Sequence, residues 1–268
     1  MAGPSESHHP AQEQDRQPGR QAAMQPTPRA EMRDYRGTGR LAGKAALISG
    51  GDSGTGRAVA IGFAKEGADV AIVYLEEHED AEATRAVIEQ EGRRCVALAG
   101  DIGDEVFCRE AVSEVAETFG RLDILVNTRP SNTRRSASRT SARRSWSVPS
   151  RPISSACFTS PRPAFRTCGK ARRSSTAPRS PAYRGSSHLI DYASTKGAIV
   201  SFTRSLAGQL KERKIRVNAV APGPVWTPLI PASFPAEKVE GFGEQTILGR
   251  PLEPDEVAPS WRRTTRSG

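Results

Sequence analysis

Two residues of the sequence could transfer a proton. Tyr192 and Lys196 stand four positions apart at the start of a stretch, residues 192–210, that predicts a long amphipathic helix. Residues with this separation project from the same face of a helix, so the phenol and the ammonium would be neighbours. A phenol has an ordinary pKa of about 10, and a nearby positive charge lowers it by stabilising the phenolate. The pair could act as a proton relay, although a surface Tyr and Lys is the commoner meaning of this spacing.

A glycine-rich segment, residues 49–56, could hold a phosphate group; its sequence is Ser-Gly-Gly-Asp-Ser-Gly-Thr-Gly. Gly50 and Gly54 permit a tight turn, and Gly56 lets the following helix pack closely on the preceding strand. The free N–H groups and the dipole at the start of that helix favour a pyrophosphate. A flexible glycine loop is the alternative, but the strand–turn–helix context favours a dinucleotide site. Three other residues of the turn belong to the predicted site: Asp52, Ser53 and Thr55.

Residues at the ends of three further predicted strands fit the same cofactor. Asp101 and Ile102 follow the third strand, where an acid can accept a hydrogen bond from an adenine amino group. Asn127 ends the fourth strand and Tyr74 the second, at the edge where open α/β sheets bind ligands. An Asp at the position of Tyr74 would read the ribose hydroxyls of NAD, and the turn itself lacks a basic residue for a 2′-phosphate, although Arg57 follows it. The sequence therefore predicts NAD or NADP and favours neither.

Alternating strands and helices must position these residues. The expected strands are residues 45–48, 70–74, 96–99, 122–126 and 216–221, and the expected helices are 58–66, a stretch ending at 91, 105–119 and 192–210. This alternation predicts a Rossmann-type α/β fold, with a doubly wound parallel sheet in a single domain over residues 41–259. Residues 1–40 are rich in Gln, Pro and Gly and predict a flexible arm.

The motifs occur in the order and spacing of the short-chain dehydrogenase/reductase family, which the chain resembles over residues 43–127 and 182–259. The motifs that carry the resemblance are Ser49–Gly56, Gly100-Asp101-Ile102, Leu125-Val126-Asn127, Tyr192-xxx-Lys196 and Asn218-Ala-Val-Ala-Pro-Gly223. The stretches Gly50–Ala60 and His188–Pro231 are similar to bacterial members known as general stress oxidoreductases.

This resemblance implies hydride transfer between NAD(P) and a small carbonyl or alcohol substrate. Tyr192 would be the acid/base, and Lys196 would bind the nicotinamide ribose and tune the phenol. Three residues would line the nicotinamide side, and the loop from Val225 onward would cover the substrate; the three are Pro222, Gly223 and Thr227. The family resemblance also implies a homo-oligomer, either a dimer or a tetramer.

The sequence departs from the family pattern in its middle. The family places a catalytic serine thirteen residues before the tyrosine, but here that position is Arg179, and Ser180 follows one place late. Ser180 is therefore only a weak candidate for the catalytic hydroxyl. The family's relay also uses a helix asparagine, and no Asn occurs between Asn132 and Asn218.

A shifted reading frame explains these departures. Read one base earlier, with suitable codons, residues 174–181 become Ile-Ile-Asn-Ser-Ala-Ser-Val-Thr, which resembles the family's strand and its serine. The same direction of shift gives family-like sequence at residues 158–171 and 261–268. We therefore hypothesise a frameshift at about 128–181 and again after 259. The aberrant segment and the tail, residues 260–268, would compromise the central helix and strand and the final strand, and could leave the enzyme inactive.

Composition limits the other classes of function. The net charge is +9, but residues 128–181 carry twelve Arg, one Lys and no acid, so +13 lies there and −4 elsewhere. This segment has few aromatic residues and no RNA-binding motif, so nucleic-acid binding is a minor alternative. No apolar run predicts a membrane helix, no signal pattern predicts secretion, and the four cysteines show no metal-ligand spacing, so we expect a cytoplasmic protein without a metal. The main alternative is a non-catalytic dinucleotide-binding remnant or pseudoenzyme.

Overall fold

The computed structural model describes residues 9–15, 19–128, 173–176 and 190–264. The elements in chain order are β1 (Ala45–Ser49), α1 (Gly54–Lys65), β2 (Asp69–Tyr74), α2 (His78–Gln90), β3 (Cys95–Ala99), α3 (Glu105–Phe119), β4 (Ile124–Asn127), β5 (Arg173–Thr176), α7 (Ile190–Gln209), the 3₁₀ helix η2 (Lys211–Arg213), β6 (Arg216–Ala219), α8 (Ala236–Val239) and α9 (Pro254–Thr264).

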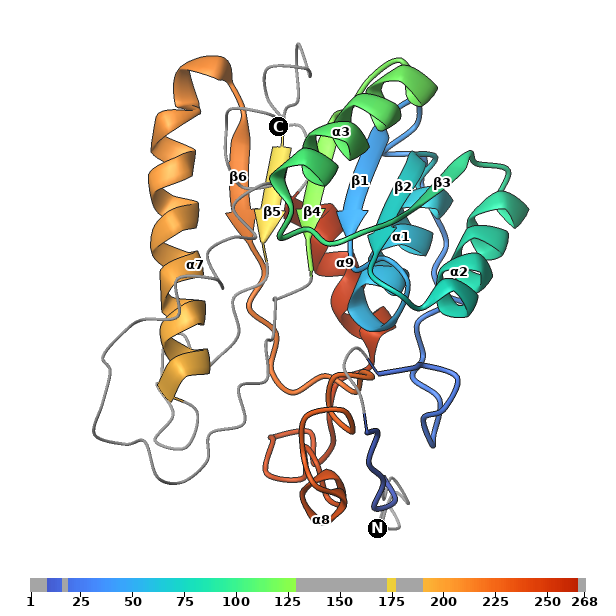
Figure 1. Ribbon diagram of the computed structural model, residues 1–268, viewed down its shortest axis with the longest axis vertical. Helices are drawn as coiled ribbons and strands as arrows, with labels where there is room; N and C mark the ends of the chain where they lie inside the picture. Colours follow the sequence, from blue (N-terminus) through green and yellow to red (C-terminus); the bar gives the residue numbers. More distant parts are fainter. Residues whose placement is uncertain (1–8, 16–18, 129–172, 177–189, 265–268) are drawn as a thin grey trace.

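Six parallel strands form one sheet in the order β3-β2-β1-β4-β5-β6 (Figure 1). The chain starts in the middle with β1, builds outward through β2 and β3, and then crosses to β4, β5 and β6 on the other side. The predicted doubly wound parallel sheet is therefore confirmed. Between β1 and β4 the order of the strands reverses, and open sheets of this kind bind ligands outside the carboxyl ends of the strands at such a point.

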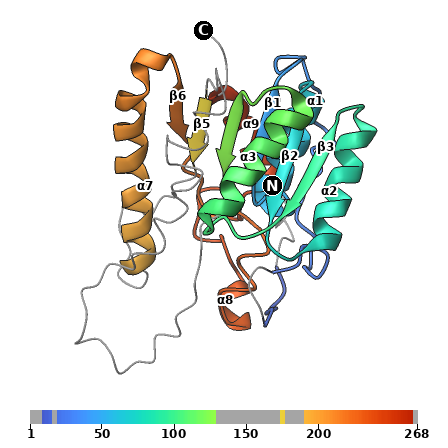
Figure 2. The same cartoon turned by 45° about the horizontal axis from the view of Figure 1, so that its top comes forward.

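Helices cover both faces of the sheet (Figures 1 and 2). One core cluster joins α1, α2 and α9 to alternate strand residues such as Ala46 and Ile48. The other joins α3 and α7 to the residues between them, such as Ala45 and Leu47. Every residue of β1 and β2 is buried. Burial on both faces explains why these strands read as continuous apolar runs in the sequence rather than as alternating ones.

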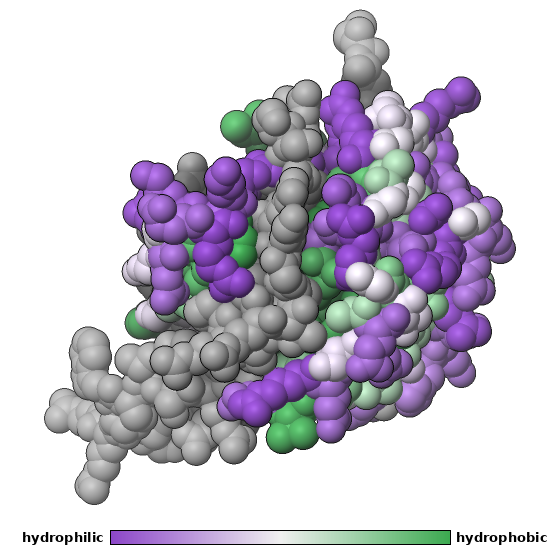
Figure 3. Space-filling view, turned by 90° about the horizontal axis from the view of Figure 1, so that it is seen from above, coloured by the Kyte–Doolittle hydropathy of each residue, from purple (hydrophilic) through white to green (hydrophobic). Residues whose placement is uncertain are grey.

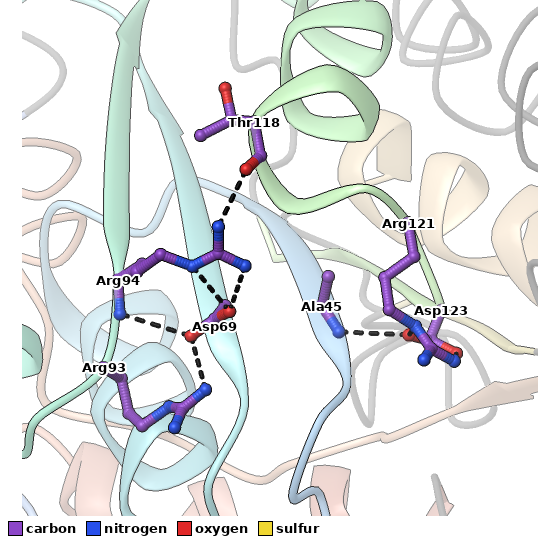
Figure 4. Close-up of polar contacts among 7 residues, drawn as sticks. All are labelled: Ala45, Asp69, Arg93, Arg94, Thr118, Arg121 and Asp123. Carbon is purple, nitrogen blue, oxygen red and sulfur yellow. Dashed lines mark hydrogen bonds and ion pairs between the residues drawn. The ribbon is translucent and has the colours of Figure 1, made fainter.

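Two carboxylates hold the amino ends of the central strands (Figure 4). Asp69, the first residue of β2, accepts hydrogen bonds from the guanidinium groups of Arg93 (2.6 Å) and Arg94 (2.6 and 2.9 Å). Asp123 accepts from the N–H of Ala45 at 3.1 Å and from Arg121 at 2.6 and 2.7 Å. Burial alone would raise the pKa of both carboxyls, but these bonds and the arginine charges outweigh it and lower each pKa. The ionised side chains therefore stabilise this edge of the fold.

Figure 3 shows the surface on the side of the amino edge of the sheet, viewed from above Figure 1. The described part of this surface is mostly hydrophilic, with small apolar areas between the polar ones. No helix of the described chain is both long and apolar enough to cross a membrane.

The N-terminal segment differs from its prediction. Met24, Ala30 and Met32 are almost fully buried, and the Nε1–H of Trp226 donates to the carbonyl oxygen of Pro26 at 2.8 Å. The prediction of a flexible arm is therefore wrong for residues 9–15 and 19–40. Their apolar side chains are too far apart in the sequence to form a periodic pattern, yet each one is buried against the rest of the domain.

The frameshift hypothesis concerns residues that are only partly described. Within 128–181, Thr128 and β5 are described, and β5 pairs in parallel with both β4 and β6. Backbone pairing of a central strand is thus present, in a segment whose sequence is Arg-Ser-Ser-Thr. In the predicted aberrant tail, Trp261 is fully buried in the core cluster beside α1, because α9 extends to Thr264.

Candidate active site

The glycine-rich turn links β1 to α1 at the carboxyl edge of the sheet. Gly50 and Gly54 have positive φ angles of 68° and 50°, which favour glycine. A Cβ on Gly56 would lie 1.8 Å from the carbonyl oxygen of Gly50, so only glycine fits there. The turn is closed against β2, where the N–H of Gly50 donates to the carbonyl oxygen of Val73 at 2.7 Å. The predicted reasons for the glycines at these three positions therefore hold in the structure.

Side chains of the turn fix its shape from within. Asp52 is 3% exposed, and its carboxylate accepts from the Ser53 hydroxyl at 3.0 Å. The hydroxyl of Thr84, on α2, donates to the backbone carbonyl of Asp52 at 2.9 Å. Thr55, half-buried, lies in the first turn of α1. The start of α1 therefore meets the carboxyl edge in one defined conformation.

Asn127 occupies the point where the strand order reverses. Its Oδ1 lies 3.5 Å from the Ser49 hydroxyl, and its side-chain Nδ2 is buried with no hydrogen-bond partner in the described chain. The next residue, Thr128, donates its hydroxyl to the carbonyl oxygen of Ser49 at 2.6 Å. An unpaired buried N–H donor is unfavourable, and it indicates a place for a bound acceptor.

The residues predicted to contact the adenosine half lie at the ends of β2 and β3. These ends are joined by a hydrogen bond of 2.8 Å from the N–H of Gly100 to the carbonyl of Tyr74. The Tyr74 hydroxyl lies 2.9 Å from Nδ1 of His78. Asp101 is exposed and accepts from the N–H of Gly103 at 2.8 Å, whereas the side chain of Ile102 packs into the core beneath α3.

The surroundings of Tyr74 raise the pKa of its phenol. Burial is the largest cause, and the negative charges of Glu82 and Asp52 raise the pKa further, while the positive charge of Arg85 lowers it in part. The phenol therefore stays neutral at physiological pH and can donate or accept one hydrogen bond with His78.

Arg57, which follows the turn in the sequence, is 6% exposed and pairs with Glu31 at 3.3 Å. Its guanidinium faces the N-terminal segment.

Tyr192 and Lys196 share one face in the first turns of α7, as their spacing predicts. Lys196 is 2% exposed, and its ammonium lies 5.3 Å from the centroid of the Tyr192 ring. The hydroxyl of Thr195 donates to the Tyr192 carbonyl at 2.8 Å, which fixes the backbone of this turn. An ammonium desolvated this strongly requires nearby negative or π-electron density, and the phenol ring provides part of it.

A loop after β6 approaches the glycine-rich turn. Pro222 and Gly223 are half-buried, and Val225 is fully buried, where it forms an isolated parallel bridge with Leu252. Thr227 is 7% exposed, and its hydroxyl oxygen is buried without a hydrogen-bond partner in the described chain. A Cβ on Gly54 would lie 3.0 Å from Cγ2 of Thr227, so the loop touches the turn directly.

These observations fit a bound dinucleotide. Gly56 has no room for a side chain, so the turn packs tightly at the start of α1, and the buried Asn127 Nδ2 and Thr227 Oγ1 offer unused hydrogen-bonding atoms on segments that contact the turn. The structure thus brings the turn, Asn127 and Thr227 together at one edge. No group of three or more metal-ligating side chains occurs in the ranges described.

Some expected site residues cannot be placed, and one was missed. Arg179 and Ser180 lie outside the described residues. Gln21, in the predicted flexible arm, accepts a hydrogen bond from the N–H of Gly54 at 2.7 Å and so belongs to the turn. A single polar residue in a Pro- and Gln-rich segment gives no sequence signal for such a contact.

Comparison with known proteins agrees with this geometry. Residues 50–261 match the family described as enoyl-(acyl carrier protein) reductase. General stress protein 39 of Bacillus subtilis is 49% identical over 249 residues, which cover 92% of this chain and 86% of that protein. The NADPH-dependent aldehyde reductase 1, chloroplastic, of Arabidopsis thaliana is 40% identical over 256 residues, covering 93% and 89%.

A solved structure of a dehydrogenase has the same fold as this chain. A short chain dehydrogenase from Burkholderia cenocepacia in complex with NADP superposes with a TM-score of 0.70 at 31% identity, covering 85% of this chain and 92% of the other.

Proposed function

Because the chain belongs to the short-chain dehydrogenase/reductase family, whose cofactor is NAD or NADP, we propose that it reduces small aldehydes or ketones and oxidises the corresponding alcohols. Aldehydes are the first substrates to test, since a relative that is 40% identical is named an aldehyde reductase. The bound nicotinamide would supply or accept the hydride.

Tyr192 would protonate the carbonyl oxygen during reduction and deprotonate the alcohol during oxidation. The observation that carries this role is the buried ammonium of Lys196, 5.3 Å from the Tyr192 ring centroid. A fixed positive charge at that distance stabilises the phenolate that forms when the proton leaves. Lys196 would also hold the nicotinamide ribose.

The remaining site residues would bind the cofactor. The turn from Gly50 to Gly56 would hold the pyrophosphate, with Asp52, Ser53, Gly54 and Thr55 shaping it. Asn127 and Thr227 would donate to the nicotinamide half through the two unpaired atoms, and Val225 would help to enclose it. Tyr74, Asp101 and Ile102 would lie at the adenosine half, with Pro222 and Gly223 at the nicotinamide.

Substitution of Tyr192 tests the relay. Tyr192→Phe removes only the hydroxyl, so we expect carbonyl reduction to be lost while the dissociation constants for NADH and NADPH, measured by nicotinamide fluorescence, remain near those of the unaltered protein. Turnover retained in Tyr192→Phe would exclude Tyr192 as the acid/base. Cofactor binding without turnover in the unaltered protein would instead support the pseudoenzyme, and the oligomer implied by the family can be measured on the same sample by light scattering.

A further inference from the structure

The N-terminal segment contacts the cofactor site at its adenosine side. We refer to residues 19–32 as the strap. Within it, the side-chain carbonyl of Gln21 accepts from the N–H of Gly54 at 2.7 Å, and the N–H of Gln21 donates to the carboxylate of Asp80, on α2, at 2.9 Å. Gln21 and Asp80 are 4% and 7% exposed. One buried residue therefore connects the glycine-rich turn to α2.

Ion pairs hold the strap in this register on both sides of Gln21. Arg20 pairs with the buried carboxylate of Glu77 at 3.3 Å, just before α2. Glu31 pairs with the buried guanidinium of Arg57 at 3.3 Å, one turn into α1. The strap is thus tied both to α1, which follows the glycine-rich turn, and to the residue before α2.

The strap also contacts the loop after β6 and the start of α9. At its first residue, Gly19, a Cβ would be 2.5 Å from the carbonyl oxygen of Pro228 in that loop. The Nε1–H of Trp226 donates to the carbonyl of Pro26 at 2.8 Å, and the backbone of Arg29 exchanges hydrogen bonds with Glu253 and Asp255 at 2.9 and 3.0 Å. Figure 1 shows the blue N-terminal part of the chain below the carboxyl edge of the sheet, near the orange loop.

Gln21 supports the turn at the N–H group of Gly54, which the other contacts of the turn do not reach. Gly54 has a positive φ and no side chain, so it makes no side-chain contact of its own that would fix its N–H group. Of its neighbours, Thr227 supplies only a van der Waals contact, whereas Gln21 supplies a directional hydrogen bond. With Gly54 held in this way, the free N–H groups at the start of α1 keep a fixed orientation.

We propose that Gln21 is a positioning residue of the dinucleotide site: it holds the glycine-rich turn in its binding conformation, and Asp80 holds Gln21. This inference rests on the proposed function, since it assumes that the turn binds NAD(H) or NADP(H). Gln21 touches the turn, not the cofactor, so its removal is expected to weaken binding without changing the chemistry at Tyr192.

Titration of the full-length chain with NADH and with NADPH at 15 °C tests the proposal. In Gln21→Ala the backbone bond to Asp80 survives while the side-chain bond to Gly54 is lost. One net hydrogen bond corresponds to an increase in Kd of about two- to tenfold. We expect that increase for both cofactors, a matching rise in the cofactor KM, and an unchanged kcat at saturating cofactor. Gln90→Ala, an exposed glutamine at the end of α2, is the matched control and should leave Kd unchanged.

A second pair of variants tests the link to Asp80. Asp80→Ala removes the anchor of Gln21, so it should raise Kd in the same direction, and the double variant should be no weaker than the worse single one because both changes break one chain of contacts. Gln21→Asn is one methylene too short to reach Gly54 and should reproduce the effect of Gln21→Ala if the alanine variant does not fold.

Three outcomes separate the possibilities. A lower melting temperature with unchanged Kd in Gln21→Ala would make Gln21 a stabilising residue only and overturn the proposal. A lower Kd would mean that Gln21 competes with the cofactor for the N–H of Gly54, and would also overturn it. If the unaltered protein binds neither NADH nor NADPH, the proposed function fails and the inference with it.

Discussion

Replacement of Glu66 by Gln should destabilise the fold in a pH-dependent way. Glu66 follows α1 and is fully buried. Its carboxylate accepts hydrogen bonds from the N–H groups of Thr38 and Arg40 at 2.9 and 3.0 Å, from the Tyr35 hydroxyl, and from Arg262 of α9 at 3.2 Å. One charge therefore joins the N-terminal segment to the first and last helices.

The magnitude follows from the pKa of Glu66. Burial alone would raise it, but the hydrogen bonds from Tyr35, Arg40 and Thr38 outweigh burial and lower it from 4.5 to about 2. The pKa of Tyr35 shifts in the matching direction, to about 12, through burial and through its hydrogen bond to Glu66, so the phenol keeps its proton and the carboxyl stays ionised. Each unit between the unfolded and folded pKa is worth about 1.4 kcal/mol, which gives about 3 kcal/mol in favour of the ionised, folded state.

The sign of the pH dependence is fixed by the direction of the shift. A folded pKa below the unfolded one adds stability that is complete above pH 4.5 and is lost as the pH falls toward about 2. Gln mimics the protonated carboxyl, so Glu66→Gln should be about 3 kcal/mol less stable than the unaltered protein at pH 7. About half of this difference should remain at pH 3.

Urea denaturation followed by tryptophan fluorescence, at pH values from 7 to 3, measures this difference. The melting temperature at pH 7 should fall by about 6–12 °C. Glu91→Gln is the control, because Glu91 is 34% exposed and pairs with Lys65 at 3.0 Å, an ion pair expected to contribute less than about 1 kcal/mol. A constant difference between Glu66→Gln and the unaltered protein across this pH range would refute the assigned role of the charge.

Three further predictions concern the turn, the amino edge and the aberrant segment. Gly56→Ala should abolish NADH binding in a fluorescence titration, because its Cβ would collide with the carbonyl of Gly50, whereas Gly208→Ala, in an open position of α7, should bind normally and be about 0.5–1 kcal/mol more stable. Asp123→Ala should lower stability at pH 7, and this loss should shrink as the pH falls below about 4, because the folded pKa of Asp123 is depressed. Sequencing the DNA that encodes residues 128–181 tests the frameshift directly; restoring the earlier frame should raise both the melting temperature and carbonyl reduction, and a restored protein with neither gain would contradict the hypothesis.

The pattern of residues in the sequence was sufficient to predict the strand and the helix on either side of the glycine-rich turn. The apolar run of β1, the glycines and the helix that follows occupy consecutive residues, so local rules of spacing apply to them. The strap was not predicted, because its burial depends on contacts with residues far away in the sequence. The hydrogen bond from Gly54 to Gln21 spans 33 positions, and that from Arg29 to Glu253 spans 224. No periodicity can report contacts of this kind.

The central strand β5 shows the opposite situation. The family pattern implies a strand there, but the apolar pattern of the residues as written does not predict one. β4, its neighbour, has the sequence Ile-Leu-Val-Asn and is buried throughout, as expected for a strand covered on both faces. β5 pairs with β4 over four residues, Ser174 with Leu125 and Ser175 with Val126. A sheet tolerates this pairing because the hydrogen bonds are made by the backbone, which is the same for every residue type. Under the frameshift hypothesis the earlier frame would place Ile-Ile here, and two Ile side chains can bury more apolar area than two Ser side chains. The backbone topology of the family is therefore present in this chain, and the hypothesis predicts that restoring the frame would stabilise the centre of the sheet.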